Sequence, residues 1–463
     1  MLAVRVLLCG GEARTSHRTL KEVTGINAPF TASLAGSRKG HPPRASAPPR
    51  PIRGPPWPSS GSYPAPHGRP AETSASAAGY PAGVTFPVVG IIGGGQLARM
   101  AHQAAIPLGI RTRLLADTPQ DSAALVVNDV VLGDYRDLDT LRRFAAGCDV
   151  VTFDHEHVPT EHLRTLLAEG VAVRPGPDAL VFAQDKGLMR AKLDSLGVPC
   201  PRHRLVTDPA DVAAFAAEGP EGWPVVLKTT RGGYDGKGVW VVHDLAEAAE
   251  PFRAGVPVLA EEKVDFVREL AADVVRSPHG QAVAYPVVES WQKDGICHEV
   301  TAPAPDLSPE LAAEAQALAL RVAGQLDITG HLAVELFETR DGRILVNELA
   351  MRPHNSGHWS IDGAVTSQFE NHLRAVLDLP LGDPRPRARW TVMVNVLGGD
   401  YPDMYHAYLH CMARDPGLRI HMYGKDVKPG RKVGHVTVFG DDLDDVRERA
   451  RHAAGYLRGD ITE

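Results

Sequence analysis

Two glutamates in the last third of the chain could hold a metal ion between them. Glu335 lies in the strand pattern HLAVELFE, and Glu348 lies in the next such pattern, RILVNELA. Asp341-Gly342 between them is a hairpin-turn signal, so we expect the two carboxylates to face each other from neighbouring strands. Facing carboxylates repel unless a cation separates them, and Mg²⁺ is commonly held by one or two carboxylates together with substrate phosphates. The spacing predicts a Mg²⁺ site, with two solvent-facing surface glutamates as the alternative.

A polar loop follows this pair, and a glycine-rich hairpin precedes it. Residues 352–358, RPHNSGH, have a composition typical of an anion-binding loop. Residues 225–242, VVLKTTRGGYDGKGVWVV, predict a strand, a glycine-rich loop and a strand. Because Gly238 follows Lys237 and no helix comes next, this loop is not a P-loop. It could still cover phosphates with backbone amides, with Lys228 as the strand lysine. A mobile surface hairpin is the alternative.

A glycine turn near residue 93 could bind a phosphate. The predicted strand 87–92 is followed by GGGQLARM, which fits G-x-G-x-x-A, and Asp117 ends the next predicted strand. This is the dinucleotide fingerprint, so an NAD-dependent oxidoreductase is a rival interpretation. The glycines chiefly bring backbone amides and a helix N-terminus to an anion, and any phosphorylated ligand satisfies that requirement.

The elements that must position these groups alternate strand and helix at first and then form hairpins. From residue 86 the alternation predicts a parallel sheet covered on both faces. From about residue 184 we expect a helix, several hairpins and an amphipathic helix at 308–325. Residues 385–463 predict a small α/β domain of three strands and one helix.

The composition limits the kinds of partner. The chain has 463 residues, enough for roughly three domains, and 43% of them are hydrophobic. A formal net charge of −7 argues against general nucleic-acid or membrane-surface binding. The five cysteines are scattered without a CxxC motif, which suits reduced thiols in a cytoplasm. No apolar run approaches the ~18–20 residues of a membrane span. We expect a cytoplasmic protein with neither nucleic acid nor membrane as partner.

Residues 1–85 differ from the rest of the chain. They are rich in Pro, Arg, Ser, Ala and Gly and contain few acidic residues. Such a segment cannot bury enough apolar surface to offset its ordering entropy, so we expect a tail without fixed structure. An organelle transit peptide, a functional disordered tail and an over-extended reading frame are the open explanations.

These motifs, taken in order, resemble the ATP-grasp superfamily and, within it, the N5-carboxyaminoimidazole ribonucleotide synthases. The resemblance spans about 88–457 and rests on six motifs: GGGQLARM, EHVP at 156–159, GGYDGKG, NELAMRPHNSGHW, SQFENHLRA, and YGK with GRKVGH. It implies an α/β ATP-grasp architecture. An N-terminal doubly wound parallel-sheet domain would cover 86–184 and the ATP-grasp domain 185–382, with a small glycine-loop lid at about 200–264 and a central mixed sheet. A small C-terminal domain would cover 383–463.

The resemblance also implies an ATP site. Lys186 and Lys228 would contact phosphates, Glu269 would accept a ribose hydroxyl, and Glu335 and Glu348 would hold Mg²⁺ with Asn347 beside them. The remaining implied ATP ligands are Gly233, Tyr234, Asp235, Gly236, Lys237, Gly238, Val239, Glu261, Glu262, Lys263, Val264 and Gln292. Many family members carry His where this chain has Gln292, and Gln cannot titrate near neutrality.

A ribonucleotide site is implied as well. Its ligands would be Gly94, Gly95, Gln96, Leu97, Glu156, Tyr234, Asp235, His354, Asn355, Lys425, Arg431 and Lys432. The implied reaction uses ATP to turn bicarbonate into carboxyphosphate and carboxylates the exocyclic amine of 5-aminoimidazole ribonucleotide. Arg352 would hold bicarbonate by a bidentate fork. His354 and Asp235 are both candidates for moving the proton.

Three other functions stay open at this level. A formate-dependent glycinamide ribonucleotide transformylase shares the superfamily and the acyl-phosphate chemistry, although the HNSGH loop and the C-terminal motifs fit it less well. The NAD-dependent oxidoreductase and a catalytically inactive nucleotide-binding protein belong to different classes. The resemblance favours a homodimer that acts on small molecules.

Overall fold

The computed structural model describes residues 86–461 with gaps at 221, 234–235 and 402. The expected tail, residues 1–85, therefore lies outside the described residues, as do Tyr234 and Asp235 of the predicted site. No helix in the described part of the chain is long and apolar enough to cross a membrane.

The first sheet is parallel, as the alternation of strands and helices predicted. Its strand order is β3-β2-β1-β4. The strands are β1 Val88–Ile92, β2 Arg111–Ala116, β3 Asp129–Leu132 and β4 Val150–Phe153. Every residue of β1 is buried: Val89 and Ile91 pack in one core cluster with α1 (Gln96–Ala105), and Ile92 packs in another with α2 (Leu138–Ala145). Helices thus cover both faces of this sheet, which explains its continuous apolar strands.

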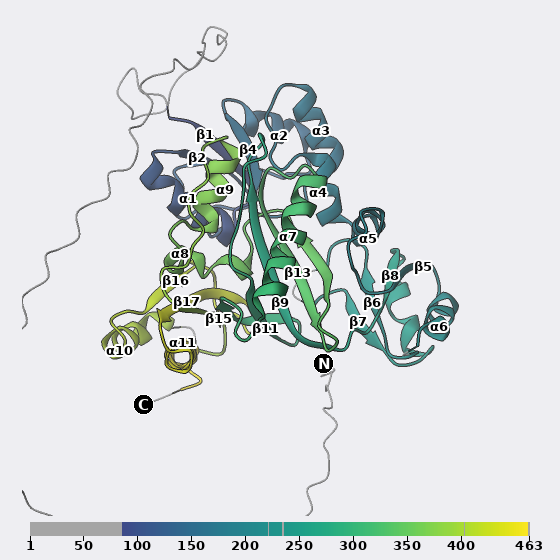
Figure 1. Ribbon diagram of the computed structural model, residues 1–463. Helices are drawn as coiled ribbons and strands as arrows, with labels where there is room; N and C mark the ends of the chain where they lie inside the picture. The colour runs from purple at the N-terminus through teal and green to yellow at the C-terminus, as the bar shows by residue number, and fades with distance from the viewer. Residues whose placement is uncertain (1–85, 221, 234–235, 402, 462–463) are drawn as a thin grey trace, which may run out of the picture. The chain divides into compact units, whose positions relative to one another are not determined.

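A smaller antiparallel sheet carries the glycine-rich loop. Its order is β5-β8-β6-β7, and the loop joins β6 to β7 (Figure 1). The strands are β5 His203–Val206, β6 Val225–Thr229, β7 Val239–Val242 and β8 Val258–Glu262. Phe215 of α6 (Pro209–Glu218) is buried against Val225 and Leu227 of β6 in a core cluster of this sheet's own.

The largest sheet in the described residues, called the central sheet below, has nine strands. Their order is β14-β13-β9-β11-β12-β15-β17-β16, with β10 paired to β9. We expected a mixed sheet here, and this was wrong, because all of its described pairings are antiparallel. Short turns join β9 to β10, β11 to β12 and β13 to β14, and a short turn can join only antiparallel neighbours. The strands are β9 Phe266–Arg276, β10 Ala282–Ala284, β11 Val288–Lys293, β12 Ile296–Ala302, β13 Gly330–Thr339, β14 Ile344–Ala350, β15 Trp390–Leu397, β16 Arg419–Met422 and β17 Lys432–Gly440.

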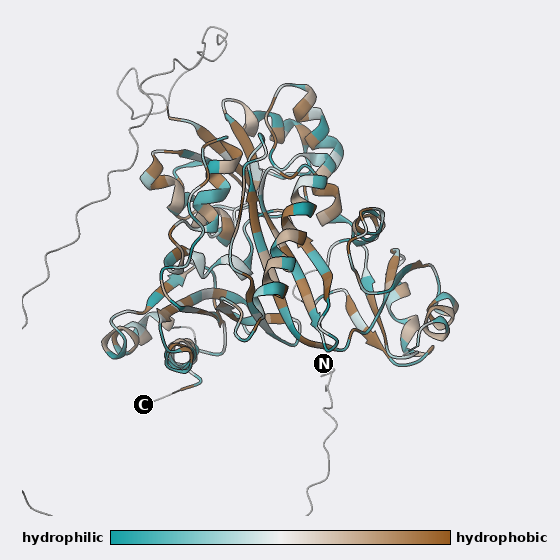
Figure 2. Cartoon of the chain, viewed as in Figure 1, coloured by the Kyte–Doolittle hydropathy of each residue, from teal (hydrophilic) through white to brown (hydrophobic). Residues whose placement is uncertain are grey.

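The strands of the C-terminal segment continue this sheet, because β15 pairs with β12. Hydrophobic residues follow its central strands, whereas the helices show both polar and apolar positions (Figure 2). Helix α7 (Pro309–Gln325) packs on the sheet through the predicted apolar stripe, of which Ala315, Leu318 and Val322 are buried. The remaining helices are α3 Thr160–Ala168, α4 Pro177–Gln184, α5 Lys186–Ser195, α8 Ser360–Gly363, α9 Gln368–Val376, α10 Tyr408–Arg414 and α11 Leu443–Arg458. Short 3₁₀ helices are η1 Ile106–Leu108, η2 Glu247–Ala249, η3 Pro251–Ala254, η4 Asn355–Gly357 and η5 Met404–Ala407.

A buried carboxylate attaches the last helix to the sheet. The Glu299 side chain on β12 is only 3% exposed. Its oxygens accept from Arg447 Nε at 3.1 Å and Arg451 Nε at 2.6 Å, both on α11. A buried charge is tolerated only when it is paired and hydrogen-bonded, so α11 must stay docked to keep Glu299 satisfied.

Glu299→Gln should lower the free energy of unfolding by about 1–3 kcal/mol, because the acceptor of two guanidinium groups loses its charge. A thermal melt should show this as a Tm lower by about 2–4 °C per kcal/mol. Glu448→Gln on the same helix is the matched control, since Glu448 is 76% exposed and 3.9 Å from Arg414. We expect the control to stay within about 0.5 kcal/mol of wild type. Equal losses in the two variants would contradict the role given to Glu299.

Candidate functional site

The predicted hairpin exists, and its two glutamates face each other. In the antiparallel pair of β13 and β14, Glu335 is registered directly with Glu348. The chain turns between Thr339 and Arg343, where the backbone N–H of Thr339 donates to the Arg343 carbonyl at 2.9 Å. Gly342 supplies the positive φ of 78° that this turn requires. The sequence prediction of opposed carboxylates is confirmed.

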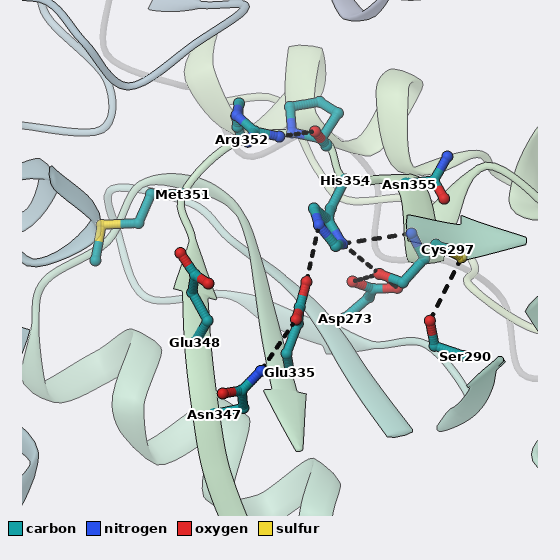
Figure 3. Close-up of polar contacts among 12 residues, drawn as sticks. Asp273, Ser290, Cys297, Glu335, Asn347, Glu348, Met351, Arg352, His354 and Asn355 are labelled. Atoms are coloured by element: carbon teal, nitrogen blue, oxygen red, sulfur yellow. Dashed lines mark hydrogen bonds and ion pairs between the residues drawn. The ribbon is translucent and has the colours of Figure 1, made fainter. Parts of the chain in front are cut away.

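Glu335 contacts a histidine of the polar loop. His354 Nε2 lies 3.2 Å from Glu335 Oε1, and Asn347 Nδ2 donates to Glu335 Oε2 at 3.5 Å (Figure 3). Burial alone would raise the pKa of Glu335. The neighbouring His354, Lys432 and Lys228 outweigh burial and hold that pKa below its ordinary value. Glu335 is therefore an anion surrounded by positive groups.

The two predicted lysines reach the same hairpin. Lys186, the first residue of α5, places Nζ 2.6 Å from Glu348 Oε1. Lys228, near the end of β6, donates from Nζ to Asn347 Oδ1 at 2.9 Å. The structure thus brings together groups from the smaller sheet, from α5 and from the hairpin formed by β13 and β14. Lysines in these positions suit the transfer of a phosphoryl group, because they can stabilise charge that develops on its oxygens.

Glu261 anchors one of these lysines. Its buried carboxylate lies 2.6 Å from Lys228 Nζ and accepts from Arg190 Nε, also at 2.6 Å. Burial opposes its ionisation, yet Lys228 and Arg190 together keep the pKa of Glu261 below its ordinary value. The backbone of Glu261 is paired within the smaller sheet to His203 and Val226. The side chain of Glu261 therefore fixes the lysine, a role that the sequence analysis did not assign to it.

A pocket opens beside the hairpin and contains five of the predicted residues: Glu269, Gln292, Glu335, Asn347 and His354. Ser290 and Ser356 also line it and were not predicted. Burial, with a smaller contribution from the charge of Glu335, raises the pKa of Glu269 to about 7, and Lys228 opposes the shift. Glu269 is therefore poised between its neutral and charged forms at neutral pH.

The donor set of this site fits Mg²⁺. Glu335, Glu348 and Asn347 offer carboxylate and amide oxygens, the hard ligands that Mg²⁺ prefers. Within the residues that the structure describes, no three His, Cys, Asp or Glu side chains cluster closely enough to hold a metal by themselves. Zn²⁺ usually takes three or four such ligands, whereas Mg²⁺ takes one or two carboxylates and completes its shell with substrate phosphates and water. The residues present therefore match a shared metal–phosphate site.

Arg352 and Glu156 lie together at the end of β14. Glu156 accepts from Arg352 Nε at 3.0 Å and from the backbone N–H of Met351 at 2.8 Å. Glu156 follows β4 of the parallel sheet, so this contact joins the first sheet to the central hairpin. The predicted bicarbonate ligand and the predicted ribonucleotide ligand are thus direct neighbours.

Some side chains of the polar loop face the pocket, and others are buried in the core. His354 faces the pocket, and Asn355 exchanges two amide hydrogen bonds with Asn395, at 3.0 and 2.8 Å. His358 is instead fully buried, 5.2 Å from the ring of His435, and burial lowers its pKa well below the ordinary value. Only the first part of this loop is available to an anion.

The glycine turn and the C-terminal motif meet, although they lie at opposite ends of the described chain. Lys425 Nζ donates to Gln96 Oε1. Asp154 accepts from the backbone N–H groups of Gly95 at 3.0 Å and Ala98 at 2.8 Å. Lys432 begins β17, and Arg431 precedes it on the surface. Because Asp154 already occupies two amides of the turn, a phosphate here would depend mainly on the cationic side chains.

The described part of the glycine-rich loop lies against the central sheet. Gly236 and Gly238 have φ values of 76° and 73°, which favour glycine. A Cβ on Gly236 would come within 3.3 Å of the Gly295 Cα in the β11–β12 turn. Gly233, Lys237 and Val239 are described as well. Lys263 and Val264 connect β8 to β9, the passage between the two sheets.

Five site-forming residues were missed: Asp154, Asp273, Ser290, Ser356 and Asn395. Asp154 could have been found, because it directly follows β4, the strand beside β1, and the carboxyl ends of parallel strands meet at one edge. Ser356 could also have been found, because it lies in the polar loop 352–358 and two positions from its partner His354. Asp273, Ser290 and Asn395 gave no such indication, because the strands that carry them have ordinary strand patterns.

Models of three protein domains match the chain in succession. The "Ribonucleotide synthetase preATP-grasp domain" matches residues 86–184, the "ATP-grasp domain" residues 191–369, and the "Phosphoribosylaminoimidazole carboxylase C-terminal domain" residues 391–449. The order of these matches agrees with the architecture expected from the sequence.

Curated relatives and solved structures match over the same region. The N5-carboxyaminoimidazole ribonucleotide synthase of Mycobacterium tuberculosis is 54% identical over 378 residues, 80% of this chain and 88% of the relative. That of Corynebacterium ammoniagenes is 47% identical over 387 residues, 80% and 92%. The crystal structure of the Thermus thermophilus synthetase matches with a TM-score of 0.72 at 40% identity, covering 81% of this chain and 99% of that one. The Aspergillus clavatus synthase in complex with ADP and 5-aminoimidazole ribonucleotide matches with a TM-score of 0.74 at 33% identity, with the same coverage.

The raised pKa of Glu269 predicts a pH-dependent stability difference. An unfolded Glu titrates near ~4.3, so below that pH Glu269 is protonated in both states and carries no cost. Between ~4.3 and about 7 the unfolded chain ionises this group while the folded protein keeps it protonated, so stability falls across this range and the full cost is present above about 7. Glu269→Gln is neutral throughout. Without nucleotide or metal, it should melt above wild type at pH 8 and close to wild type near pH 4.5. A variant Tm below wild type at pH 8 would contradict the shift.

Proposed function

This chain belongs to the N5-carboxyaminoimidazole ribonucleotide synthase family, and we propose that it carboxylates 5-aminoimidazole ribonucleotide on its exocyclic amine, using ATP and bicarbonate, in purine biosynthesis. The observation that carries the proposal is the convergence of Lys186, Lys228 and His354 on the hairpin that carries the facing pair Glu335 and Glu348. This arrangement joins a phosphate-binding group to a polar pocket in which an acceptor can sit.

ATP is proposed to lie between the smaller sheet and the central sheet. Lys186 and Lys228 would contact its phosphates, and Glu269 would accept a ribose hydroxyl. The connection 263–264 would pass beside the base, and the glycine-rich loop would cover the phosphates. Glu335 and Glu348 would hold Mg²⁺ with Asn347 beside them, and the ion would neutralise charge on the phosphate oxygens. On binding, the lysine–carboxylate contacts at the hairpin would be exchanged for contacts to phosphate and metal.

The first step is proposed to activate bicarbonate, which is a poor electrophile. A bicarbonate oxygen attacks the γ-phosphorus of ATP, the bond to the β–γ bridging oxygen breaks, and ADP leaves. The two lysines stabilise the charge that develops on the phosphoryl oxygens. Arg352 would hold bicarbonate through its planar fork. Its neighbour Glu156 keeps the guanidinium at the edge of the hairpin.

The second step is proposed to transfer the carboxyl group. The exocyclic nitrogen of 5-aminoimidazole ribonucleotide attacks the carboxyl carbon, or the CO₂ released from carboxyphosphate, and inorganic phosphate departs. The nitrogen must lose one proton. His354, whose ring lies in the pocket, and Asp235, which lies outside the described residues, are the candidates for accepting it. Because carboxyphosphate hydrolyses readily, the glycine-rich loop must exclude water from this space.

The ribonucleotide is proposed to lie near the meeting of the first and last segments. Lys425, Arg431 and Lys432 would bind its phosphate beside the turn Gly94, Gly95, Gln96 and Leu97. Glu156 and Asn355 would contact the rest of the molecule, and Tyr234 stays a sequence-based candidate. Gln292 lines the pocket and can form hydrogen bonds there without carrying a proton near neutrality. A homodimer in the cytoplasm is part of the proposal, supported by the family and by the scattered cysteines.

One coupled assay tests the reaction. ADP release by the full chain should require both 5-aminoimidazole ribonucleotide and bicarbonate. Formate with glycinamide ribonucleotide should not replace them, nor should NAD raise the Tm. ADP release that depends on formate and glycinamide ribonucleotide would replace this proposal with the transformylase. A nucleotide-dependent rise in Tm without any turnover would favour an inactive binding protein.

Glu335→Gln and Glu348→Gln should each reduce turnover roughly 10²-fold or more, because each removes one of the two charges proposed to hold Mg²⁺. The double variant should be little worse than either single one, since residues that act as a unit are not additive. Each variant should also need more Mg²⁺ for its residual activity. Glu338→Gln on the same strand is the control, because Glu338 pairs with Arg268 outside the pocket lining. Normal turnover by Glu348→Gln at limiting Mg²⁺ would refute the metal site.

A further inference from the structure

A chain of polar contacts leads from the buried core of the central sheet to the pocket. Asp273 on β9 is 1% exposed, and the hydroxyl of Ser356 lies 3.1 and 3.2 Å from its two carboxylate oxygens. Ser356 Oγ is also 2.8 Å from His354 Nδ1. On its other side, His354 Nε2 lies 3.2 Å from Glu335 Oε1. Figure 3 shows His354 between Glu335 and Asp273.

The chemistry of these groups gives the contacts a direction. An ionised carboxylate can only accept, so Asp273 takes the single hydroxyl hydrogen of Ser356. Ser356 then holds His354 Nδ1 through two contacts, its hydroxyl oxygen at 2.8 Å and its backbone N–H, which donates to Nδ1 at 3.4 Å. The imidazole ring is held at Nδ1 from the core, which leaves Nε2 as the nitrogen that faces Glu335 and the pocket.

The presence of a buried carboxylate at position 273 is not explained by a gain in stability. Within the described residues, its one ion-pair contact is the long 3.8 Å approach of His331 Nε2. That histidine directs Nδ1 to the Arg352 carbonyl, at 3.0 Å, and burial lowers its pKa to about 3, so it supplies no positive charge at neutral pH. A buried carboxylate without a cationic partner costs free energy, and an apolar residue on β9 would be cheaper.

We propose that Asp273 is a positioning residue that acts through Ser356 to fix the ring of His354, with Nδ1 held by Ser356 and Nε2 directed into the pocket. The proposal deepens the proposed function, since it rests on His354 acting there. His354 is the group proposed to meet the reacting atoms, and the buried Asp273 and Ser356 act through its ring.

Kinetic coupling provides the first test. Ser356→Ala and Asp273→Asn should each lower kcat by roughly 10- to 100-fold, the usual effect of losing an orienting partner. The KM for ATP should change less than about twofold, because neither residue is placed at the nucleotide. His354→Asn should lower kcat at least as far. Adding Ser356→Ala or Asp273→Asn to His354→Asn should cost nothing more, because the ring through which both act is already gone.

A matched control separates positioning from packing. Thr152 and His372 form another buried hydroxyl–imidazole contact of 2.8 Å, away from the pocket lining. Thr152→Val should lower the Tm without changing kcat. If Asp273→Asn proves unfolded in a thermal melt, Ser356→Ala carries the test alone, because it removes a single oxygen. An equal loss of rate in the wild-type and His354→Asn backgrounds, or full activity in Ser356→Ala, would overturn the proposal.

A readout independent of turnover keeps this proposal distinguishable from the proposed function. In protein labelled with ¹⁵N-histidine, the ring signals of His354 are those lost in His354→Asn. The Nδ1 signal should shift in Ser356→Ala and in Asp273→Asn, because each changes the contacts that hold this nitrogen, and it should stay in place in Thr152→Val. An Nδ1 signal that is unchanged in Ser356→Ala would overturn the positioning role. If the coupled assay shows no turnover while Nδ1 behaves as expected, the proposed function fails and the positioning of His354 stands.

Discussion

The structure depends on how two facing carboxylates are neutralised. Register places Glu335 opposite Glu348 on adjacent strands, where they would repel each other unless positive groups were near. The chain meets this constraint with residues from separate elements: Lys186 from α5, Lys228 from the smaller sheet and His354 from the polar loop. Glu261 and Arg190 then hold Lys228 in place. The site is therefore a balanced set of charges that phosphate and metal can rearrange.

Other contacts join distant segments of the chain to the surroundings of this pair. Glu156, which follows β4 of the first sheet, accepts a hydrogen bond from Arg352 at the end of the hairpin. Lys425 of the C-terminal segment donates a hydrogen bond to Gln96 of the glycine turn. The C-terminal strands extend the central sheet through β12 and β15, and Glu299 fastens α11 to it. Groups for nucleotide, bicarbonate and ribonucleotide can therefore be supplied by a rigid sheet and the loops at its edges.

Features that depend on residues close together in the sequence were predicted. Contacts between residues far apart in the sequence were not. The turn at Asp341-Gly342 was enough to oppose Glu335 and Glu348, and the continuous apolar strands were enough to predict the first parallel sheet. The hairpins of the central sheet were predicted, but the order in which they join was not, because the pattern of a strand does not say which distant strand will pair with it. Asp273 was missed for the same reason, since its partner Ser356 is 83 positions away. His358 shares a motif with His354, yet only folding shows that it is buried.

Tracing oxygen from bicarbonate to phosphate tests the central claim most directly, namely that this site phosphorylates bicarbonate. In a rapid turnover experiment with ¹⁸O-labelled bicarbonate, ATP and 5-aminoimidazole ribonucleotide, the attacking oxygen becomes the bridge between carbon and phosphorus. It stays with phosphorus when the carbon–oxygen bond breaks. The account predicts inorganic phosphate that carries one ¹⁸O atom from bicarbonate for each ADP released. Unlabelled phosphate at an undiminished rate of ADP release would contradict it.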